Sequence, residues 1–263
     1  MTVGGRDAVI VDMTAPVASL TFARPGKRNA MTDDMWQRVA AFFVDLEPSR
    51  DNVNAVILKG AAGAFSAGAD LSEVARAAGD LATSTAYCEM VVSALHAVAN
   101  SPVPTLAAVD GAAHGGGLEL AIMADCRIAT ARSSFSLPVA SLGVVPDRLT
   151  IARLLALIGP AALQWFVIGG APLGADEALR LGLIDALVPD AAALEASERR
   201  YRASIAAAPA ALVKTRVLAR SLQTLPPRHG LEDAMIASFV DGTVARAAAR
   251  FVGTGEPRTE GEG

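Results

Sequence analysis

Short apolar runs alternate with longer helical patterns along the first half of the chain, and this alternation limits the fold more than any other feature. Strands are indicated at residues 8–12, 17–22, 53–59, 103–109 and 127–130. Helices are indicated after Thr32, a predicted N-cap, and at residues 84–100. Strands that alternate with helices predict βαβ units and a largely parallel sheet. From about Thr150 onward the pattern is almost entirely helical.

Two glycine-bearing blocks interrupt this pattern. They are Phe-Ser-Ala-Gly-Ala-Asp at residues 65–70 and His-Gly-Gly-Gly-Leu-Glu at residues 114–119. Small residues leave the backbone uncovered, so each block can present a bare N–H group to a ligand. Two such groups that converge are what an enzyme needs to hold an oxyanion. The alternative is a structural one, in which a glycine-rich turn packs a helix tightly against a strand.

Length and composition narrow the class of protein. A chain of 263 residues is expected to form one large domain, or one domain with a small appendage. With 52% hydrophobic and 19% charged residues, it suits a soluble protein with a substantial core. The net charge of −4 argues against generic binding to nucleic acid or to an anionic membrane. The first seven residues lack an apolar signal core and no apolar run is long enough to span a bilayer, so a cytoplasmic location is expected.

The cysteines give no sign of a metal site. Neither Cys88 nor Cys126 lies in a CxxC motif or in a Cys/His spacing typical of metal ligands. Two buried free thiols are expected, and a disulfide between them is the alternative.

The glycine blocks belong to a wider set of motifs that resembles the crotonase, or enoyl-CoA hydratase/isomerase, superfamily. The other motifs are Arg-Pro-Gly-Lys-Arg-Asn-Ala at residues 24–30, Ala-Asp-Glu-Ala at 175–178 and Leu-Gly-Leu-Ile-Asp at 181–185. The resemblance implies an α/β fold, a crotonase-like spiral of ββα repeats with a helical C-terminal trimerisation region. It places the spiral core with its acyl-CoA site at residues 1–195 and the helical region at 196–252. The polar, glycine-rich segment at 253–263 is expected to be a flexible tail. It also implies a homotrimer or a dimer of trimers.

The resemblance also assigns site residues. The oxyanion would be held by the backbone N–H groups of Ala69 and Gly116, and Glu119 would handle protons. A first-turn Glu that only stabilises its helix is the alternative for Glu119. No separate cofactor is implied, because coenzyme A enters as part of the substrate thioester. Contacts with the substrate and coenzyme A would come from Lys27, Arg28, Ala30, Ala67, Gly68, Asp70, Leu71, Gly115, Pro138 and Val139.

The sequence departs from the hydratases of this family at one proton-handling position. They carry a second glutamate after a proline in a segment that resembles Phe-Ser-Leu-Pro at residues 135–138, and this chain has Val139 there. Valine cannot carry a proton, so the arrangement of two carboxylates around one water is incomplete. Asp147 lies just downstream and is either a substitute carboxylate or the N-cap of the helix that follows it.

The activity expected from these residues is hydration of a 2-enoyl-CoA through a stabilised thioester enolate. Two alternatives stay open. One is another reaction of the family on a specialised CoA ester, such as isomerisation, decarboxylation, hydrolysis or C–C cleavage. The other is a non-catalytic acyl-CoA-binding protein. His114, which precedes the glycines, either contacts substrate or serves as a hydrogen-bonded structural residue.

Overall fold

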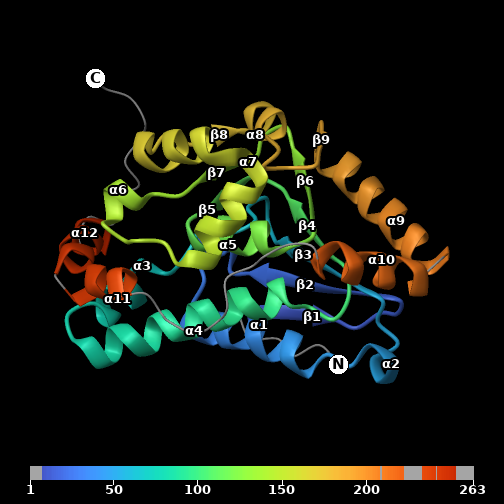
Figure 1. Ribbon diagram of the computed structural model, residues 1–263, viewed down its shortest axis with the longest axis horizontal. Helices are drawn as coiled ribbons and strands as arrows, with labels where there is room; N and C mark the ends of the chain where they lie inside the picture. The colour runs from blue at the N-terminus through green and yellow to red at the C-terminus, as the bar shows by residue number, and fades with distance from the viewer. Residues whose placement is uncertain (1–7, 208, 222–232, 241, 253–263) are drawn as a thin grey trace.

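The computed structural model describes residues 8–207, 209–221, 233–240 and 242–252 (Figure 1). The predicted tail at 253–263 lies outside these residues. Within them, the main sheet has six strands in the order β1-β2-β3-β4-β6-β9. β1 runs antiparallel to β2 and every other neighbouring pair is parallel. The strands are β1 (Ala8–Asp12), β2 (Val17–Ala23), β3 (Ala55–Gly60), β4 (Thr105–Val109), β6 (Cys126–Thr130) and β9 (Ala186–Val188).

Both faces of the main sheet are buried, as a largely parallel sheet requires. Side chains alternate along β3, so Val56 and Leu58 belong to the larger core, whereas Ile57 packs against the opposite side. On that opposite side the sheet meets Leu194 and Ile205 of α9 (Ala191–Ala207). The larger core lies between the sheet and α1 (Asp33–Asp45), α4 (Leu81–Ala99) and α5 (Gly116–Met123).

A smaller sheet stands beside the main one and carries part of the candidate site. β5 (Ala112–His114) pairs in parallel with β7 (Ser134–Ser136), and β7 pairs antiparallel with β8 (Leu173–Gly174). α5 starts two residues after β5 ends, so the second glycine block forms the turn between a strand and a helix.

Side-chain caps start several helices where the sequence predicted them. Thr32 accepts a hydrogen bond from Met35 N at the start of α1, as expected for an N-cap. Asp70 starts α3 (Leu71–Ala77) by accepting from Ser72 N, and it also pairs with Arg24 at 2.5 Å. The remaining helices are η1 (Pro25–Lys27), α2 (Pro48–Asp51), α6 (Val139–Leu142), α7 (Arg148–Gly169), α8 (Ala175–Leu181), α10 (Pro209–Ser221), α11 (Asp233–Val240) and α12 (Thr243–Val252).

The second half of the chain is less uniformly helical than its sequence indicates. β8 joins the smaller sheet and β9 extends the main sheet beyond β6. These strands have only two and three residues, which is too short for an alternating pattern to be distinguished from a loop.

α7 is long and apolar enough, by length and composition alone, to be a candidate membrane span. Its first half is tied to the protein core, because the buried Arg153 side chain donates from Nε to the carbonyl oxygen of Ile122 at 3.0 Å. The helix bends at Gly159, which has a positive φ of 74°. Beyond the bend Trp165 and Ile168 are each 74% exposed.

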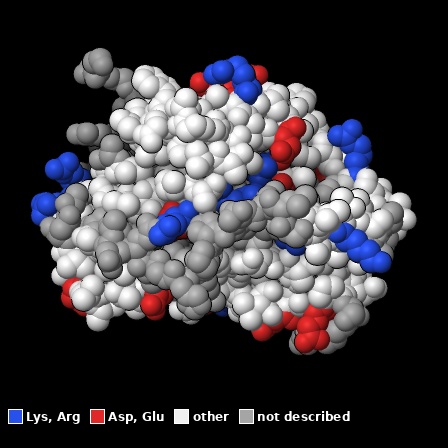
Figure 2. Space-filling view, in the orientation of Figure 1, with Lys and Arg blue, Asp and Glu red and all other residues white. Residues whose placement is uncertain are grey.

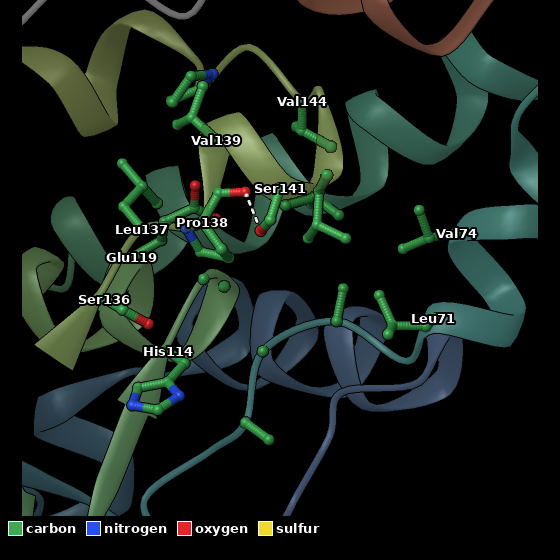
Figure 3. Close-up of a pocket in the computed structure, with 18 of the residues that line it drawn as sticks. Leu71, Val74, His114, Glu119, Ser136, Leu137, Pro138, Val139, Ser141 and Val144 are labelled. Carbon is green, nitrogen blue, oxygen red and sulfur yellow. Dashed lines mark hydrogen bonds between the residues drawn. The ribbon is translucent and has the colours of Figure 1, made fainter. Parts of the chain in front are cut away.

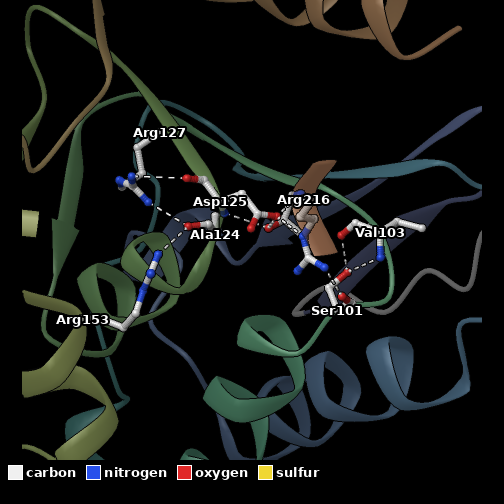
Figure 4. A network of polar contacts seen from close by, with 8 residues as sticks. Ser101, Val103, Ala124, Asp125, Arg127, Arg153 and Arg216 are labelled. Atoms are coloured by element: carbon white, nitrogen blue, oxygen red, sulfur yellow. Dashed lines mark hydrogen bonds and ion pairs between the residues drawn. The ribbon is translucent and has the colours of Figure 1, made fainter. Parts of the chain in front are cut away.

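A polar network joins α10 to the loops before β4 and β6 (Figure 4). Arg216 of α10 donates from Nε to Asp125 Oδ2 and from a terminal nitrogen to the Ser101 carbonyl, both at 2.6 Å. Arg127 and Arg153 both donate to the carbonyl oxygen of the residue before Asp125. The charge-assisted hydrogen bonds of Arg216 fix α10 to the core.

The remaining surface features agree with the small net charge. On the face in Figure 2, Lys and Arg side chains are scattered among Asp and Glu.

Both cysteines are free thiols, as expected. Cys88 is buried, but the expectation of burial is wrong for Cys126, which is exposed at the start of β6.

Candidate active site

The fold brings the two glycine blocks side by side. Ser66 and Ala113 form a parallel β-bridge, and the Ser66 carbonyl accepts a hydrogen bond from His114 N at 3.0 Å. Phe65 and Ser66 both donate from their backbone N–H groups to the Ala112 carbonyl. The first block therefore lies along β5, directly against the second.

Two backbone N–H groups are free where the blocks meet. Within the described residues, neither Ala69 N nor Gly116 N donates a hydrogen bond to a protein acceptor. They are close together, because a Cβ built on Gly116 would lie 3.6 Å from Ala69 N, and one on Gly68 would lie 3.4 Å from Gly116 N. Gly116 is also the first residue of α5, so the helix dipole places partial positive charge at this point. This arrangement suits an oxyanion.

Glycine is required at two positions beside these groups. Gly68 has a φ of +98°, and a Cβ there would lie 2.7 Å from the His114 carbonyl oxygen. A Cβ on Gly117 would lie 2.4 Å from the Ser66 carbonyl oxygen. The glycines thus allow α5 to approach the first block closely, which was the structural alternative. The same contact places the free N–H groups, so the two interpretations are compatible.

These N–H groups open onto a cavity of ≈ 300 Å³, which Figure 3 shows from close by. This volume lies at the lower end of the range usual for small-molecule sites. Most of the wall is apolar, and Glu119 contributes a carboxyl group to it. The lining residues that the sequence singled out are Ala67, Gly68, Ala69, Leu71, His114, Gly115, Gly116, Glu119, Pro138 and Val139, and Val74 and Val91 also line the cavity.

Among the described residues that line the cavity, Glu119 alone has a carboxyl group. Burial, together with the negative charge of Asp147, raises its pKa to about 8. In the described part of the chain, no side chain donates a hydrogen bond that would favour its ionised form. A carboxyl group with a pKa near the working pH exchanges protons efficiently.

Asp147 serves as the N-cap of α7. Its Oδ1 accepts from Thr150 N at 3.0 Å and its Oδ2 accepts from Thr150 Oγ1 at 2.7 Å. Its side chain is buried and does not line the cavity, although Pro146 beside it does. The negative charge of Asp147 therefore affects the pKa of Glu119 although the Asp147 side chain does not line the cavity.

Four of the predicted coenzyme A residues, Lys27, Arg28, Ala30 and Asp70, do not line the cavity. Lys27 and Arg28 are exposed, and the Arg28 carbonyl accepts a hydrogen bond from Ala67 N at 2.9 Å. The positive charge of Arg28 adds to burial in lowering the pKa of His114, so this guanidinium is near the cavity. Ala30 is half-buried in the same loop, and its carbonyl oxygen accepts a hydrogen bond from Arg24. Asp70 is engaged by Arg24 and caps α3 rather than lining the cavity.

His114 is both a cavity residue and a hydrogen-bonded one. Its Nε2 is 2.9 Å from Ser134 Oγ, and its side chain is half-buried. Cavity residues that the sequence analysis missed come from five separate elements and two loops: Trp36, Tyr87, Ser136, Leu137, Ser141, Leu142, Val144, Pro146 and Phe239. Within the described residues there is no group of three His, Cys, Asp or Glu side chains that would hold a metal ion.

A family model described as Enoyl-CoA hydratase/isomerase matches residues 12–261. The chain belongs to the enoyl-CoA hydratase/isomerase family. Because this family processes acyl-CoA thioesters, the cavity at the junction of the glycine blocks is an acyl-CoA site candidate, and the resemblance seen in the sequence is confirmed.

Relatives with modest identity cover most of the chain. A probable enoyl-CoA hydratase of Mycobacterium bovis is 34% identical over 183 residues, which is 70% of this chain and 69% of the relative. A carnitinyl-CoA dehydratase of Salmonella typhi is 31% identical over 215 residues, which is 82% of this chain and 81% of the relative.

Solved structures of the family share the fold. A putative enoyl-CoA hydratase/isomerase family protein from Hyphomonas neptunium has 34% identity and a TM-score of 0.77, with 89% of this chain and 88% of that chain covered. An enoyl-CoA hydratase from Bacillus halodurans has a TM-score of 0.80 at 22% identity, with 92% and 99% covered. The predicted crotonase-like α/β fold is confirmed.

Proposed function

We propose that this protein adds water to the double bond of a 2-enoyl-CoA thioester. The observation that carries the proposal is the convergence of three groups on one largely apolar cavity. They are the free N–H groups of Ala69 and Gly116 and the carboxyl group of Glu119. The relatives named as probable enoyl-CoA hydratases support the same reaction.

The two N–H groups stabilise the charge that forms during the reaction. When the water oxygen bonds to C3, the electrons of the C2=C3 double bond move toward the thioester and leave negative charge on its oxygen. Preorganised donors in a dry site lower the free energy of this enolate, and loss of one such donor typically costs about 10²–10³-fold in turnover rate.

Glu119 carries the proton in both steps. Its carboxylate takes one proton from the water as the oxygen bonds to C3. The resulting carboxylic acid gives that proton to C2, which restores the carboxylate and yields 3-hydroxyacyl-CoA. Val139 has no proton to exchange, so Glu119 alone takes up the proton and delivers it. Since a general acid or base contributes about 10²–10⁴-fold, we expect hydration to be slower than in a two-carboxylate site.

Product identification tests this proposal. The purified protein is incubated with crotonyl-CoA and with a longer 2-enoyl-CoA, and the products are compared with synthetic 3-hydroxyacyl-CoA by chromatography and mass spectrometry. Formation of the 3-hydroxy product supports hydration. Tight binding of both thioesters with no new product would contradict it, and would favour another reaction of the family or a non-catalytic acyl-CoA binder.

The charge of Asp147 is expected to set the pH range in which Glu119 works. Because this charge helps to raise the pKa of Glu119, Asp147→Asn should lower that pKa and move the rise of kcat/KM toward lower pH. Asn is as good an N-cap as Asp, so α7 keeps its start. The pH–rate profiles of the two proteins measure the shift. A loss above about 100-fold at every pH would instead make Asp147 a proton carrier.

A further inference from the structure

Val139 leaves the reacting water with one carboxylate instead of two, so a second group must hold it. In the described part of the chain, few cavity side chains besides Glu119 carry an N–H or O–H group, and most of these groups are hydrogen-bonded within the protein or buried. His114 is hydrogen-bonded to Ser134 Oγ. The indole nitrogen of Trp36 and the hydroxyl of Tyr87 have no hydrogen-bond partner among the described residues, but both atoms are buried and present almost no surface to a water molecule. Ser136 is the last residue of β7 and is only 7% exposed.

Ser141 differs from these residues in its position and its exposure. It lies on α6, two residues after Val139, and its exposed side chain lines the same cavity as Glu119. Figure 3 labels Glu119, Pro138 and Ser141 among the residues that line the cavity. The hydroxyl of Ser141 therefore belongs to a residue that a ligand in this cavity would meet, as the carboxyl group of Glu119 does.

The hydrogen bond that Ser141 makes leaves its oxygen available as an acceptor. Ser141 Oγ donates its proton to the carbonyl oxygen of Pro138 at 3.2 Å (Figure 3). A hydroxyl group has one proton and two acceptor lone pairs, so the lone pairs of Oγ remain for a donor in the cavity. A water molecule is such a donor, since it has two O–H groups to offer.

We propose that Ser141 Oγ and the Glu119 carboxylate together hold the reacting water. One O–H of the water donates to Ser141 Oγ and the other to Glu119, which turns a lone pair of the water oxygen toward C3. As that oxygen bonds to C3, the proton on the Glu119 side passes to the carboxylate. The proton on the Ser141 side stays on the oxygen and becomes the hydroxyl hydrogen of the product.

Ser141 is thus a water-positioning residue. It neither gains nor loses a proton, so it needs no base of its own and the pKa that governs the rate remains that of Glu119. Positioning of the attacking group alone has large effects on rate, because a displacement of about 1 Å can cost about 100-fold. This inference rests on the proposed hydration, and it names the residue that positions the water in a site with one carboxylate.

Two substitutions at Ser141 test the proposal with crotonyl-CoA as the substrate. Ser141→Ala removes the acceptor and is expected to slow turnover about 10- to 100-fold, with KM and the midpoint of the pH–rate profile unchanged. Ser141→Thr keeps a hydroxyl at the same place and is expected to restore most of the rate. In the double variant with Glu119→Gln, loss of Oγ should add little, because both residues act on the same water.

The outcomes separate this inference from the proposed function. No turnover by the wild-type protein would overturn the hydration and the role of Ser141 with it. Turnover by the wild type together with an unchanged kcat in Ser141→Ala would overturn only the role of Ser141. A rise in KM and in the dissociation constant of the thioester, with kcat unchanged, would also overturn it and make Ser141 a substrate-binding residue.

Discussion

Replacing Glu119 with glutamine is expected to slow the hydration of an enoyl-CoA thioester by about 10²–10⁴-fold, the range typical of general acid–base groups. The reason is that this carboxyl group takes the proton from water and also delivers it to C2. Glutamine has nearly the same shape but can do neither step. Initial rates with crotonyl-CoA at matched protein concentration measure the loss, and binding of a saturated acyl-CoA measures whether the cavity is intact.

The loss should not come from unfolding. The pKa of Glu119 in the folded protein, about 8, is above the ordinary value of 4.5. The folded state therefore holds a proton that the unfolded state lacks between these values, and the free energy of unfolding falls as pH rises through this window. Glutamine carries no charge at any pH, so Glu119→Gln should be at least as stable as the wild type above pH 8.

A matched control is available on α4. Glu89 is exposed and lies outside the cavity, so Glu89→Gln is expected to keep the wild-type rate. Wild-type activity in Glu119→Gln would mean that Glu119 has no part in the reaction and that another group of the cavity handles the proton.

A methyl group at Gly116 is expected to slow turnover by about 10²–10³-fold, the cost of losing one oxyanion donor. A Cβ at this position would lie 2.7 Å from Cζ2 of Trp36, whose ring is fully buried. Since neither α5 nor the ring can move without disturbing the core, Gly116→Ala should displace the backbone that carries the donor. Overpacking of this kind typically costs about 1–3 kcal/mol of stability as well.

The control for this substitution is a glycine with open space around it. A Cβ on Gly174 would meet nothing within 4 Å, and Gly174 has an ordinary negative φ. Gly174→Ala should therefore keep both activity and melting temperature close to those of the wild type. If Gly116→Ala turned over crotonyl-CoA at the wild-type rate, the donor at Gly116 would have no part in the reaction.

Local signals in the sequence were enough to predict much of this fold and site. Thr32 starts its helix as predicted, and Asp147 takes the N-cap role that was one of its two alternatives, because an N-cap is satisfied by a residue only three positions away. The free N–H groups of Ala69 and Gly116 lie close together as the resemblance implied. Glycine spacing and capping depend on few residues, so they can be recognised without tertiary structure.

Features that depend on tertiary convergence could not be predicted. Trp36, Tyr87 and Phe239 line one cavity from three helices, and apolar helix positions give no sign of which face a ligand touches. Ser141 gave no signal because an isolated serine is common on surfaces. The effect of Asp147 on the pKa of Glu119 follows from their proximity in space, not from their separation in sequence.

The most direct test of the central claim, that the Glu119 carboxylate drives water addition, is the pH dependence of the wild-type protein. The measurement is the initial loss of conjugated-thioester absorbance of crotonyl-CoA across the range in which Glu119 ionises. With a pKa of about 8, kcat/KM should rise about tenfold per pH unit below this value and level off above it. A profile that stays flat through this range, or no loss of absorbance despite bound thioester, would contradict the account.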